Sequence, residues 1–552
     1  MDRHLPLMFL AAAVTASVTG AVADSRASGP SLSSVAARPK AVGHAPASQP
    51  STELRQTPVA QGSMPLENPE GIIGWYGYEN DVPCPDNPAL PQMIPSFAAV
   101  MPTEAQKTEP DKNTYLVLKG QRGADPDYDY GTHFLFQGHE NAAAVGGVKQ
   151  GYITRINLDA DTMHRVTLMA THDDAGKPLA PIDGSTWDPF AQRLLFTTES
   201  TGAPTYAATA SFPSVVEDVS GALGRGGYEG IQNDSQGNIW IVEDVSGPNK
   251  QGTTARQPSG FLYRYVPRQP GDLHEGTLQV LQVLNDAGQP VTFESQALLC
   301  APDQVALRSY GKTFRTNWVT IHDTATEGDV SFNANAAAKA GHGTPFKRPE
   351  NGVFRPGTHF REFYFDETGD TNATSPENGG GAAGTCVAGG WTSIFKLVQG
   401  DPSDDHGMLS LVYEGNLSVA GLDNVQFLSR DILLAVEDAG DTLHTQRKAL
   451  DSGYAFDVTL DFVAGAQPIR WLAEGRDESA AIDSAAGGFG KNDGDNEITG
   501  VHVSDGDPSV GGILGAKVPH VGYGGWRWFW TQQHGDNLTW EVIPTVEGDR
   551  DE

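Results

Sequence analysis

Three widely separated segments of the chain share one pattern: a turn, a strongly apolar run with β-strand composition, and then carboxylates. They are Gln192–Glu199, Asn238–Asp244 and Asp431–Asp438. Apolar runs without alternation are typical of strands that are buried on both faces. A carboxylate at the end of such a strand is costly to desolvate unless it is paired, hydrogen-bonded or bound to a cation. The pattern therefore predicts repeated sheets whose strand ends deliver carboxylates to a common centre.

The spacing of these segments favours a β-propeller. The first two begin 46 residues apart (238 − 192) and the last two 193 apart (431 − 238). These distances fit about one and four units of roughly 40–50 residues, the length of a propeller blade. A sandwich would rarely need so many similar units. We therefore predict an all-β fold, a β-propeller with a few short helical insertions, of which Asn333–Gly341 is the best helical stretch.

The N-terminus is typical of an exported protein. Residues 1–23 resemble a signal peptide, because Leu5–Val22 is mostly apolar and Ala21–Ala23 fits the small-residue rule for cleavage. We expect a periplasmic or secreted protein without a membrane anchor.

Three further segments follow the signal-like segment. Residues 24–63 are rich in Ser, Ala, Pro and Gln, a composition that predicts a disordered linker. Residues 64–545 form the predicted propeller domain, and 546–552 form an acidic tail.

Charge and cysteine content exclude several classes of function. The formal net charge is −32, from 69 acidic residues against 37 lysines and arginines. Nucleic acid and anionic membrane surfaces are therefore poor partners, since both require clusters of basic residues. The acidity fits either solubility and salt adaptation or a set of calcium sites. Cys84, Cys300 and Cys386 permit one disulfide without indicating the pair, and their spacing does not suggest zinc.

One segment combines a cation and a carboxylate around a proline. Arg348 and Glu350 flank Pro349, which fixes its own φ and biases Arg348 toward extended backbone. Arginine suits bidentate recognition of phosphate, and glutamate suits a metal beside it. A loop that happens to contain charges is the alternative for this segment alone.

An Arg-Pro-Glu sequence after an Ala-rich helix resembles the PhoX-type alkaline phosphatases, calcium-dependent exported enzymes built on a β-propeller. Other segments resemble motifs of that family in the same order. They are Gly138–Asn141, Gly184–Trp187 with Thr197–Glu199, Gly224–Glu229, Asp423–Asn424 with Ile432–Asp438, Asn496–Gly500, and Gln533–Gly535. The resemblance spans about Gly131 to Asn537.

The resemblance implies a function and a set of site residues. It implies six blades, a number that the repeat spacing does not fix, and a metal-dependent, monomeric hydrolase of small-molecule phosphate esters. The expected catalytic residues are Arg348, which binds the phosphate, and Glu350. His139 is expected to orient its neighbour Glu140. The expected metal ligands are Glu140, Glu199, Glu229 and Glu350, with Glu243, Asp244, Asp423, Asn424 and Glu497 as further candidates.

Two residues depart from the family's pattern. The family's iron-binding cysteine falls at Thr198, and a neutral hydroxyl is a poor substitute for a thiolate. The histidine that precedes Glu229 in the family is Tyr228. These departures argue against a family-type iron centre and favour calcium or other hard cations held by carboxylates. Two alternatives remain: a catalytically inactive calcium-binding propeller scaffold, and another calcium-propeller hydrolase of the phytase or lactonase kind.

Overall fold

The structure is a computed structural model. It describes residues 31–40, 47–62, 64–69, 71, 74–77, 108–140, 143–145, 148–249, 253–292, 302–375, 390–475, 497–533 and 537–545. The predicted signal peptide, the acidic tail and the three cysteines lie outside this part. Among the described residues, no helix has the length and apolar character needed to span a bilayer.

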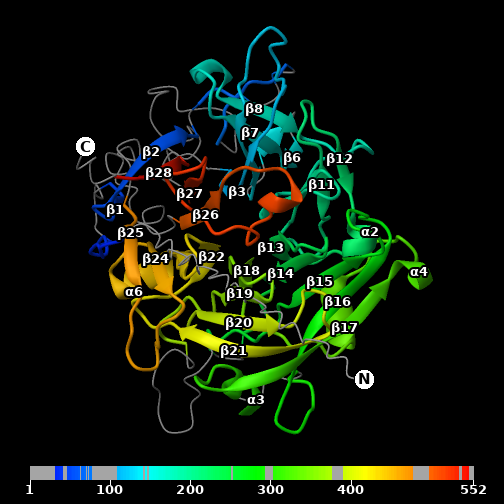
Figure 1. Ribbon diagram of the computed structural model, residues 1–552, viewed down its shortest axis with the longest axis vertical. Helices are drawn as coiled ribbons and strands as arrows, with labels where there is room; N and C mark the ends of the chain where they lie inside the picture. The colour runs from blue at the N-terminus through cyan, green and yellow to red at the C-terminus, as the bar shows by residue number, and fades with distance from the viewer. Residues whose placement is uncertain are drawn as a thin grey trace, which may run out of the picture.

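Antiparallel strands supply most of the regular structure (Figure 1). The first two sheets contain β3 (Pro110–Val117), β4 (His133–His139), β7 (Ile153–Asn157) and β8 (Val166–Ala170), then β9 (Ser185–Asp188), β10 (Arg193–Phe196), β11 (Tyr206–Ala208) and β12 (Val216–Asp218). The next two contain β13 (Tyr228–Asn233), β14 (Ile239–Glu243), β15 (Leu262–Pro267), β16 (Gly276–Leu284) and β17 (Thr313–Asp323), then β18 (Pro349–Phe354), β19 (Glu362–Glu367), β20 (Ser393–Gln399) and β21 (His406–Glu414).

The last two sheets each include a strand from the N-terminal region. They contain β22 (Leu422–Phe427), β23 (Ile432–Glu437), β24 (Ser452–Asp457) and β25 (Ile469–Ala473) with β1 (Gln49–Pro50), then β26 (Glu497–Ser504), β27 (Arg527–Gln533) and β28 (Thr539–Pro544) with β2 (Leu54–Ala60). The remaining elements are the hairpin β5 (Ala143–Val145) and β6 (Val148–Gln150), the helices α2 (Ser220–Leu223), α3 (Pro302–Leu307), α4 (Thr324–Glu327), α5 (Ala334–Ala340) and α6 (Gly440–Arg447), and the 3-10 turns η1 (Thr162–His164) and η4 (Val510–Gly512).

The sheets are arranged as blades around one axis (Figure 1). The first strands, β3, β9, β13, β18, β22 and β26, each contact the next in this order, and β26 contacts β3, so the ring closes. The third and fourth sheets are also joined edge to edge, through β17 and β21. Within the described part of the chain this is a six-bladed β-propeller, which confirms the predicted fold class.

The predicted strands and helix follow from their apolar patterns. The three apolar runs that end in acids are β10, β14 and β23, and each is the second strand of its sheet. Helix α5 begins after Asn333, whose side chain accepts from the amide of Ala336, and ends at Gly341. Buried aromatic side chains fill the space between blades, as where Trp240 contacts Phe363.

The predicted disordered linker is wrong for residues 49–60. Strand β2 pairs with β28, so an N-terminal strand completes the blade built from β26, β27 and β28. Leu54 and Ala60 are buried there. The sequence is polar and contains Pro58 because β2 is an edge strand, and an edge strand tolerates proline and needs few apolar residues.

Candidate metal centre

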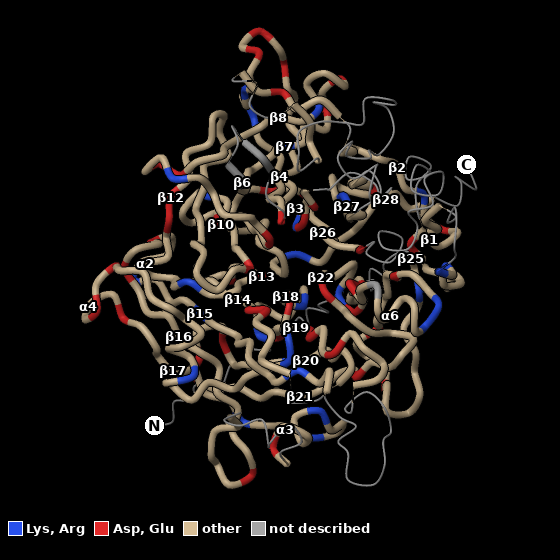
Figure 2. Tube along the Cα trace, turned by 180° about the vertical axis from the view of Figure 1, so that it is seen from behind, with Lys and Arg blue, Asp and Glu red and all other residues tan. Residues whose placement is uncertain are grey.

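A cavity is lined by residues from all six blades. Nine carboxylates and one guanidinium line it in the described part of the chain: Asp111, Glu140, Asp183, Glu199, Glu229, Arg348, Glu350, Asp423, Asp438 and Glu497. Figure 2 shows acidic positions in red near the middle of the ring, where the first strands converge.

The first strands place their acids by a repeated irregularity. In β3, β13, β18 and β22 the ladder with the second strand shifts register, and the acid is the first residue inside the shift. These acids are Asp111, Glu229, Glu350 and Asp423. A bulge bends its strand and re-aims the side chain. Four equivalent bulges therefore deliver four carboxylates to one cavity.

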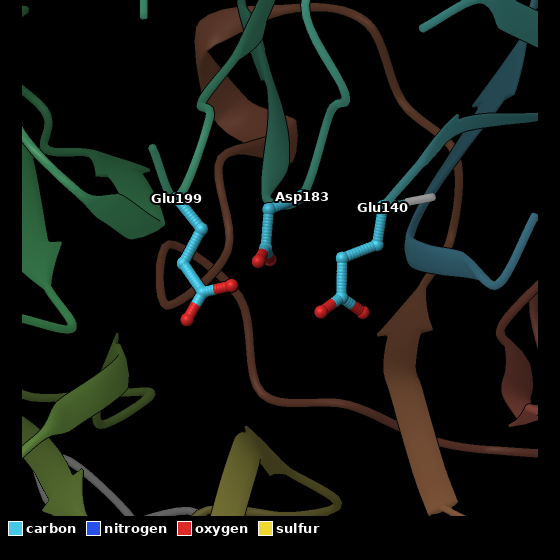
Figure 3. Close-up of side chains that lie close together, drawn as sticks. All are labelled: Glu140, Asp183 and Glu199. Carbon is cyan, nitrogen blue, oxygen red and sulfur yellow. The ribbon is translucent and has the colours of Figure 1, made fainter. Parts of the chain in front are cut away.

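The second strands deliver further acids at their C-terminal ends. Glu140 follows β4, Glu199 follows β10 and Asp438 follows β23. The carboxylates of Glu140, Glu199 and Asp183, which precedes β9, are directed into a common space in Figure 3. Acids at strand ends therefore lie at a shared centre, as predicted, but not every acid of the pattern reaches it.

Where two consecutive acids end a second strand, only one of them reaches the centre. Asp244 contacts Arg348, whereas the Oε2 atom of Glu243 accepts hydrogen bonds from Tyr263 (2.7 Å) and Asn335 (2.9 Å). The structure therefore does not bring Glu243, a predicted ligand, to the cavity. Successive side chains of a strand point to opposite faces, so the two acids cannot both face the axis.

The other predicted ligands fall into two groups. Glu140, Glu199, Glu229, Glu350, Asp423 and Glu497 line the cavity. Asn424 does not line it: its Oδ1 atom accepts from the Nζ of Lys112 at 3.0 Å, and its amide nitrogen donates to Asp423 and Thr499.

Three cavity acids were absent from the predicted set. Asp438 ends the third apolar strand, so the sequence carried a signal for it. Asp111 and Asp183 follow no apolar run, and their place depends on a bulge and on the packing of neighbouring strands.

The cavity contains groups of oxygens spaced for metal ions. Three sets of carboxylates bring one oxygen from each member within 4.8 Å of the others: Glu140 with Asp183 and Glu199, Glu199 with Glu229 and Asp244, and Glu229 with Glu350 and Asp423. The Oδ1 atoms of Asp183 and Asp244 are buried without a hydrogen-bond partner among the described residues. Such atoms require a cation or a proton. The donors are all oxygens, so the residues present fit hard divalent cations.

The two residues that depart from the family's pattern contact backbone instead of the cavity. The hydroxyl of Thr198 donates to the carbonyl of Pro204 at 2.9 Å, and the hydroxyl of Tyr228 donates to the carbonyl of Leu223 at 2.8 Å. Neither side chain lines the cavity. The donor set therefore contains no soft ligand at these positions.

His139 does not orient Glu140 as expected. Its ring nitrogens are hydrogen-bonded with the hydroxyls of Thr108 (2.8 Å) and Thr154 (3.0 Å). Glu140 instead accepts a hydrogen bond from the side-chain amide of Gln533 at 3.2 Å. Burial lowers the pKa of His139 well below its usual value, so this histidine is a neutral core residue.

Arg348 is fixed between two carboxylates. Its Nε and Nη2 atoms lie 3.0 and 2.9 Å from Oδ2 of Asp244, and Nη2 lies 3.4 Å from Oε1 of Glu350. Its φ is +51°, so the extended backbone predicted from the following proline is wrong. The left-handed conformation is costly for a residue with a side chain, and such strain is typical of functional sites.

Burial and mutual repulsion raise the pKa values of the cavity carboxylates. Burial and the nearby Asp244 raise the pKa of Glu350 to about 8, although Arg348 acts in the opposite direction. Burial raises the pKa of Asp423 to about 7, and burial together with Asp451 raises that of Asp438 to about 6. A bound cation favours the ionised form, so metal binding is coupled to proton release.

The fold and the cavity define a class: a six-bladed β-propeller with an acidic cavity on its axis that offers oxygen ligands for a metal. Residues 253–508 match the model of the family described as alkaline phosphatase PhoX. This match covers less than half of the chain and agrees with the resemblance to PhoX-type alkaline phosphatases in the sequence motifs.

A solved PhoX structure shares the fold of this chain. PhoX from Pseudomonas fluorescens in complex with vanadate, a transition state analogue, is 11% identical with a TM-score of 0.53, over 93% of this chain and 98% of that chain. A gluconolactonase from Xanthomonas campestris is 11% identical with a TM-score of 0.34, over 85% of this chain and 98% of that one. The curated proteins include no match to this chain.

Proposed function

We propose that this protein is a metal-dependent phosphatase that hydrolyses small-molecule phosphate esters, with calcium as its metal. The observation that supports this function best is the position of Arg348. In the described part of the chain it is the one cation that lines a cavity otherwise lined by carboxylates. The match to a phosphatase family model and the vanadate complex of the Pseudomonas protein support phosphate as the group recognised.

The cations and the residues of the cavity have different roles in the proposed reaction. Bound divalent cations supply charge neutralisation at the phosphoryl oxygens and an activated water. Arg348 offers a planar pair of N–H donors that matches two phosphoryl oxygens, and it stabilises the charge that develops on them. Asp244 and Glu350 hold the guanidinium in place, so little reorganisation is needed during the reaction. Glu350 also belongs to the group with Glu229 and Asp423, which links the arginine to a metal position.

The proposal also includes export and action as a monomer. The signal-like segment before Asp24 supports a periplasmic or secreted enzyme. Cell fractionation and N-terminal sequencing of the mature protein test this part, with cleavage after Ala23 as the expected result.

Turnover of a chromogenic phosphomonoester tests the function directly. We expect activity with calcium, loss of activity with a chelator, and a loss of about 100-fold in Arg348→Ala, the usual effect of removing one donor to developing charge. The matched control is Arg355→Ala. Arg355 follows the other end of β18 and pairs with Glu362 and Asp431 outside the cavity. Full activity in Arg348→Ala would rule out the role given to this residue.

Two further outcomes would assign the protein to another class. Calcium-dependent thermal stability without turnover of any phosphate ester would identify a binding scaffold. Hydrolysis of lactones, or of phytate alone, would identify a different propeller hydrolase.

Inhibition by orthovanadate is the expected result for the phosphatase, because vanadate occupies the site of the transferred phosphoryl group.

A further inference from the structure

A lysine is buried directly behind the acidic cavity. Lys112 follows Asp111 in β3, inside the same register shift, and its side chain is only 3% exposed. Its Nζ atom donates to Oδ1 of Asn424 on β22 at 3.0 Å. Strands β3 and β22 are separated in the ring by β26, so this contact joins two first strands that are not neighbours in the ring.

Four carboxylates act on this ammonium group through their charge, without a direct ion pair to it among the described residues. Asp111, Asp423, Glu229 and Asp366 all attract it and oppose the lowering of its pKa by burial. Three of the four line the cavity or belong to the oxygen groups described above. The Oδ2 atom of Asp366 is buried without a hydrogen-bond partner among the described residues. A buried ammonium is tolerated where carboxylates offset its desolvation.

The lysine uses the one atom of Asn424 that could bind a metal. The Oδ1 atom accepts from Lys112, and the Nδ2 atom donates to Asp423 (2.9 Å) and Thr499 (3.2 Å). Calcium binds an asparagine through its amide oxygen. The ammonium and a metal ion therefore compete for the same place.

The internal repeat shows what other blades hold at this position. The residue after the acid in the register shift is Asn351 in β18 and Asn424 in β22, and Gly230 in β13. Lys112 in β3 thus lies at a position where three other blades have a neutral residue. Asn351 donates to Oε1 of Glu229 at 2.9 Å, so an asparagine at such a position can contact the carboxylates of the centre.

We propose that the ammonium group of Lys112 is a built-in cation of the metal centre. It occupies the place beside the Oδ1 atom of Asn424 that a divalent ion would otherwise fill, where the charges of Asp111 and Asp423 attract a cation, so the protein binds one metal ion fewer than its carboxylates could hold. This inference rests on the metal centre of the proposed phosphatase, but it does not require that the centre be active.

Metal content measures this role without an activity assay. Each protein is equilibrated with calcium, freed of excess ion, and analysed for bound calcium per chain. We expect Lys112→Asn, which copies the residue of β18 and β22, to bind one calcium more than the wild type. We expect its melting temperature to rise more steeply with calcium concentration. Lys112→Arg keeps the positive charge and is expected to retain the wild-type metal content.

Lys347→Met is the matched control for the loss of a buried lysine. Lys347 is also 3% exposed, and it pairs with Asp370 at 2.8 Å outside the cavity lining. This variant is expected to lose stability without binding additional calcium.

Two results would overturn the inference. One is a folded Lys112→Asn variant with the calcium content of the wild type. The other is a Lys112→Asn variant that stays unfolded in millimolar calcium, since the ion is expected to take over the role of the ammonium. A gain of calcium in a protein without phosphatase activity would keep this inference and reject only the proposed function.

Discussion

At the scale of single residues, neighbouring acids have opposite roles. Asp244 and Asp438 face the centre, whereas Glu243 bonds to Tyr263 and Glu437 forms an ion pair with Arg447 at 3.0 Å. In both pairs the second acid is therefore the one that lies at the centre. The sequence indicates that both acids end a buried strand, but only the register of the strand against its neighbours decides which of them faces the cavity.

Substitution of Thr198 tests whether a metal ligand is needed at the position where the family has a cysteine. Because its hydroxyl donates to the carbonyl of Pro204, we expect Thr198→Ala to lower the free energy of unfolding by about 1 kcal/mol. Metal content is expected to stay unchanged, because the hydroxyl does not line the cavity. Urea unfolding and elemental analysis measure the two quantities. The control is Thr198→Ser, which keeps the donor, and a loss of metal in Thr198→Ala alone would make Thr198 a ligand.

Some site residues are indicated by the local sequence, whereas others are placed only by tertiary contacts. Glu140, Glu229 and Glu350 were predictable because each lies in a short segment that resembles a family motif, although Tyr228 replaces the histidine before Glu229. Asp111 and Asp183 were not, because a bulge and the packing of first strands bring them to the cavity. Asn424 was predicted as a ligand, but Lys112, which is distant in sequence, occupies its oxygen. Contacts of this kind are tertiary and leave no local pattern.

At the scale of elements, buried strands were predictable and edge strands were not. Strands β10, β14 and β23 are apolar on both faces and are therefore evident in the sequence. Strand β2 is an edge strand whose residues are exposed or half-buried between its two buried ends. Its membership of a blade is encoded by its partner β28, which lies almost 500 residues later in the chain.

The closing strand β2 leads to a prediction about truncation. A chain that begins at Met64 lacks β1 and β2 and leaves the edge of β28 unpaired. We expect its free energy of unfolding to fall by at least about 3 kcal/mol, because the ladder is lost and Leu54 alone contributes about 1.5–3 kcal/mol by burial. Aggregation through the open edge is also expected. Thermal unfolding and light scattering measure both effects.

The matched control for this truncation is a chain that begins at Ser31. It retains both closing strands, and we expect its melting temperature to equal that of the full chain. Equal stability of the two truncated chains would show that β2 does not contribute to closure of the ring.

At the scale of the whole molecule, the propeller concentrates negative charge on its axis. Each of the six blades brings at least one carboxylate to the cavity, against one guanidinium in its lining and one ammonium behind it. The fold therefore holds like charges together at a free-energy cost that only cations or protons can offset. The net charge of −32 shows in the sequence that acidic residues are in excess. The convergence of the acids on the axis follows from closure of the ring.

This concentration of charge predicts how pH affects the metal-free protein. The pKa of Glu350 rises on folding from 4.5 to about 8 and that of Asp423 from 3.8 to about 7. Between about pH 4 and 8 the folded protein therefore binds more protons than the unfolded chain. Its free energy of unfolding must fall as the pH rises through this range.

Calcium should remove this dependence, because a bound ion takes the place of the protons and keeps the carboxylates ionised. We expect urea unfolding with a chelator to show decreasing stability from about pH 5 to about pH 8, and saturating calcium to restore it most at the upper end. Glu350→Gln removes one of the titrating groups, so the metal-free variant should lose less stability over the same range than the wild type. Stability that rises with pH in the chelated protein would contradict the arrangement of charges on the axis.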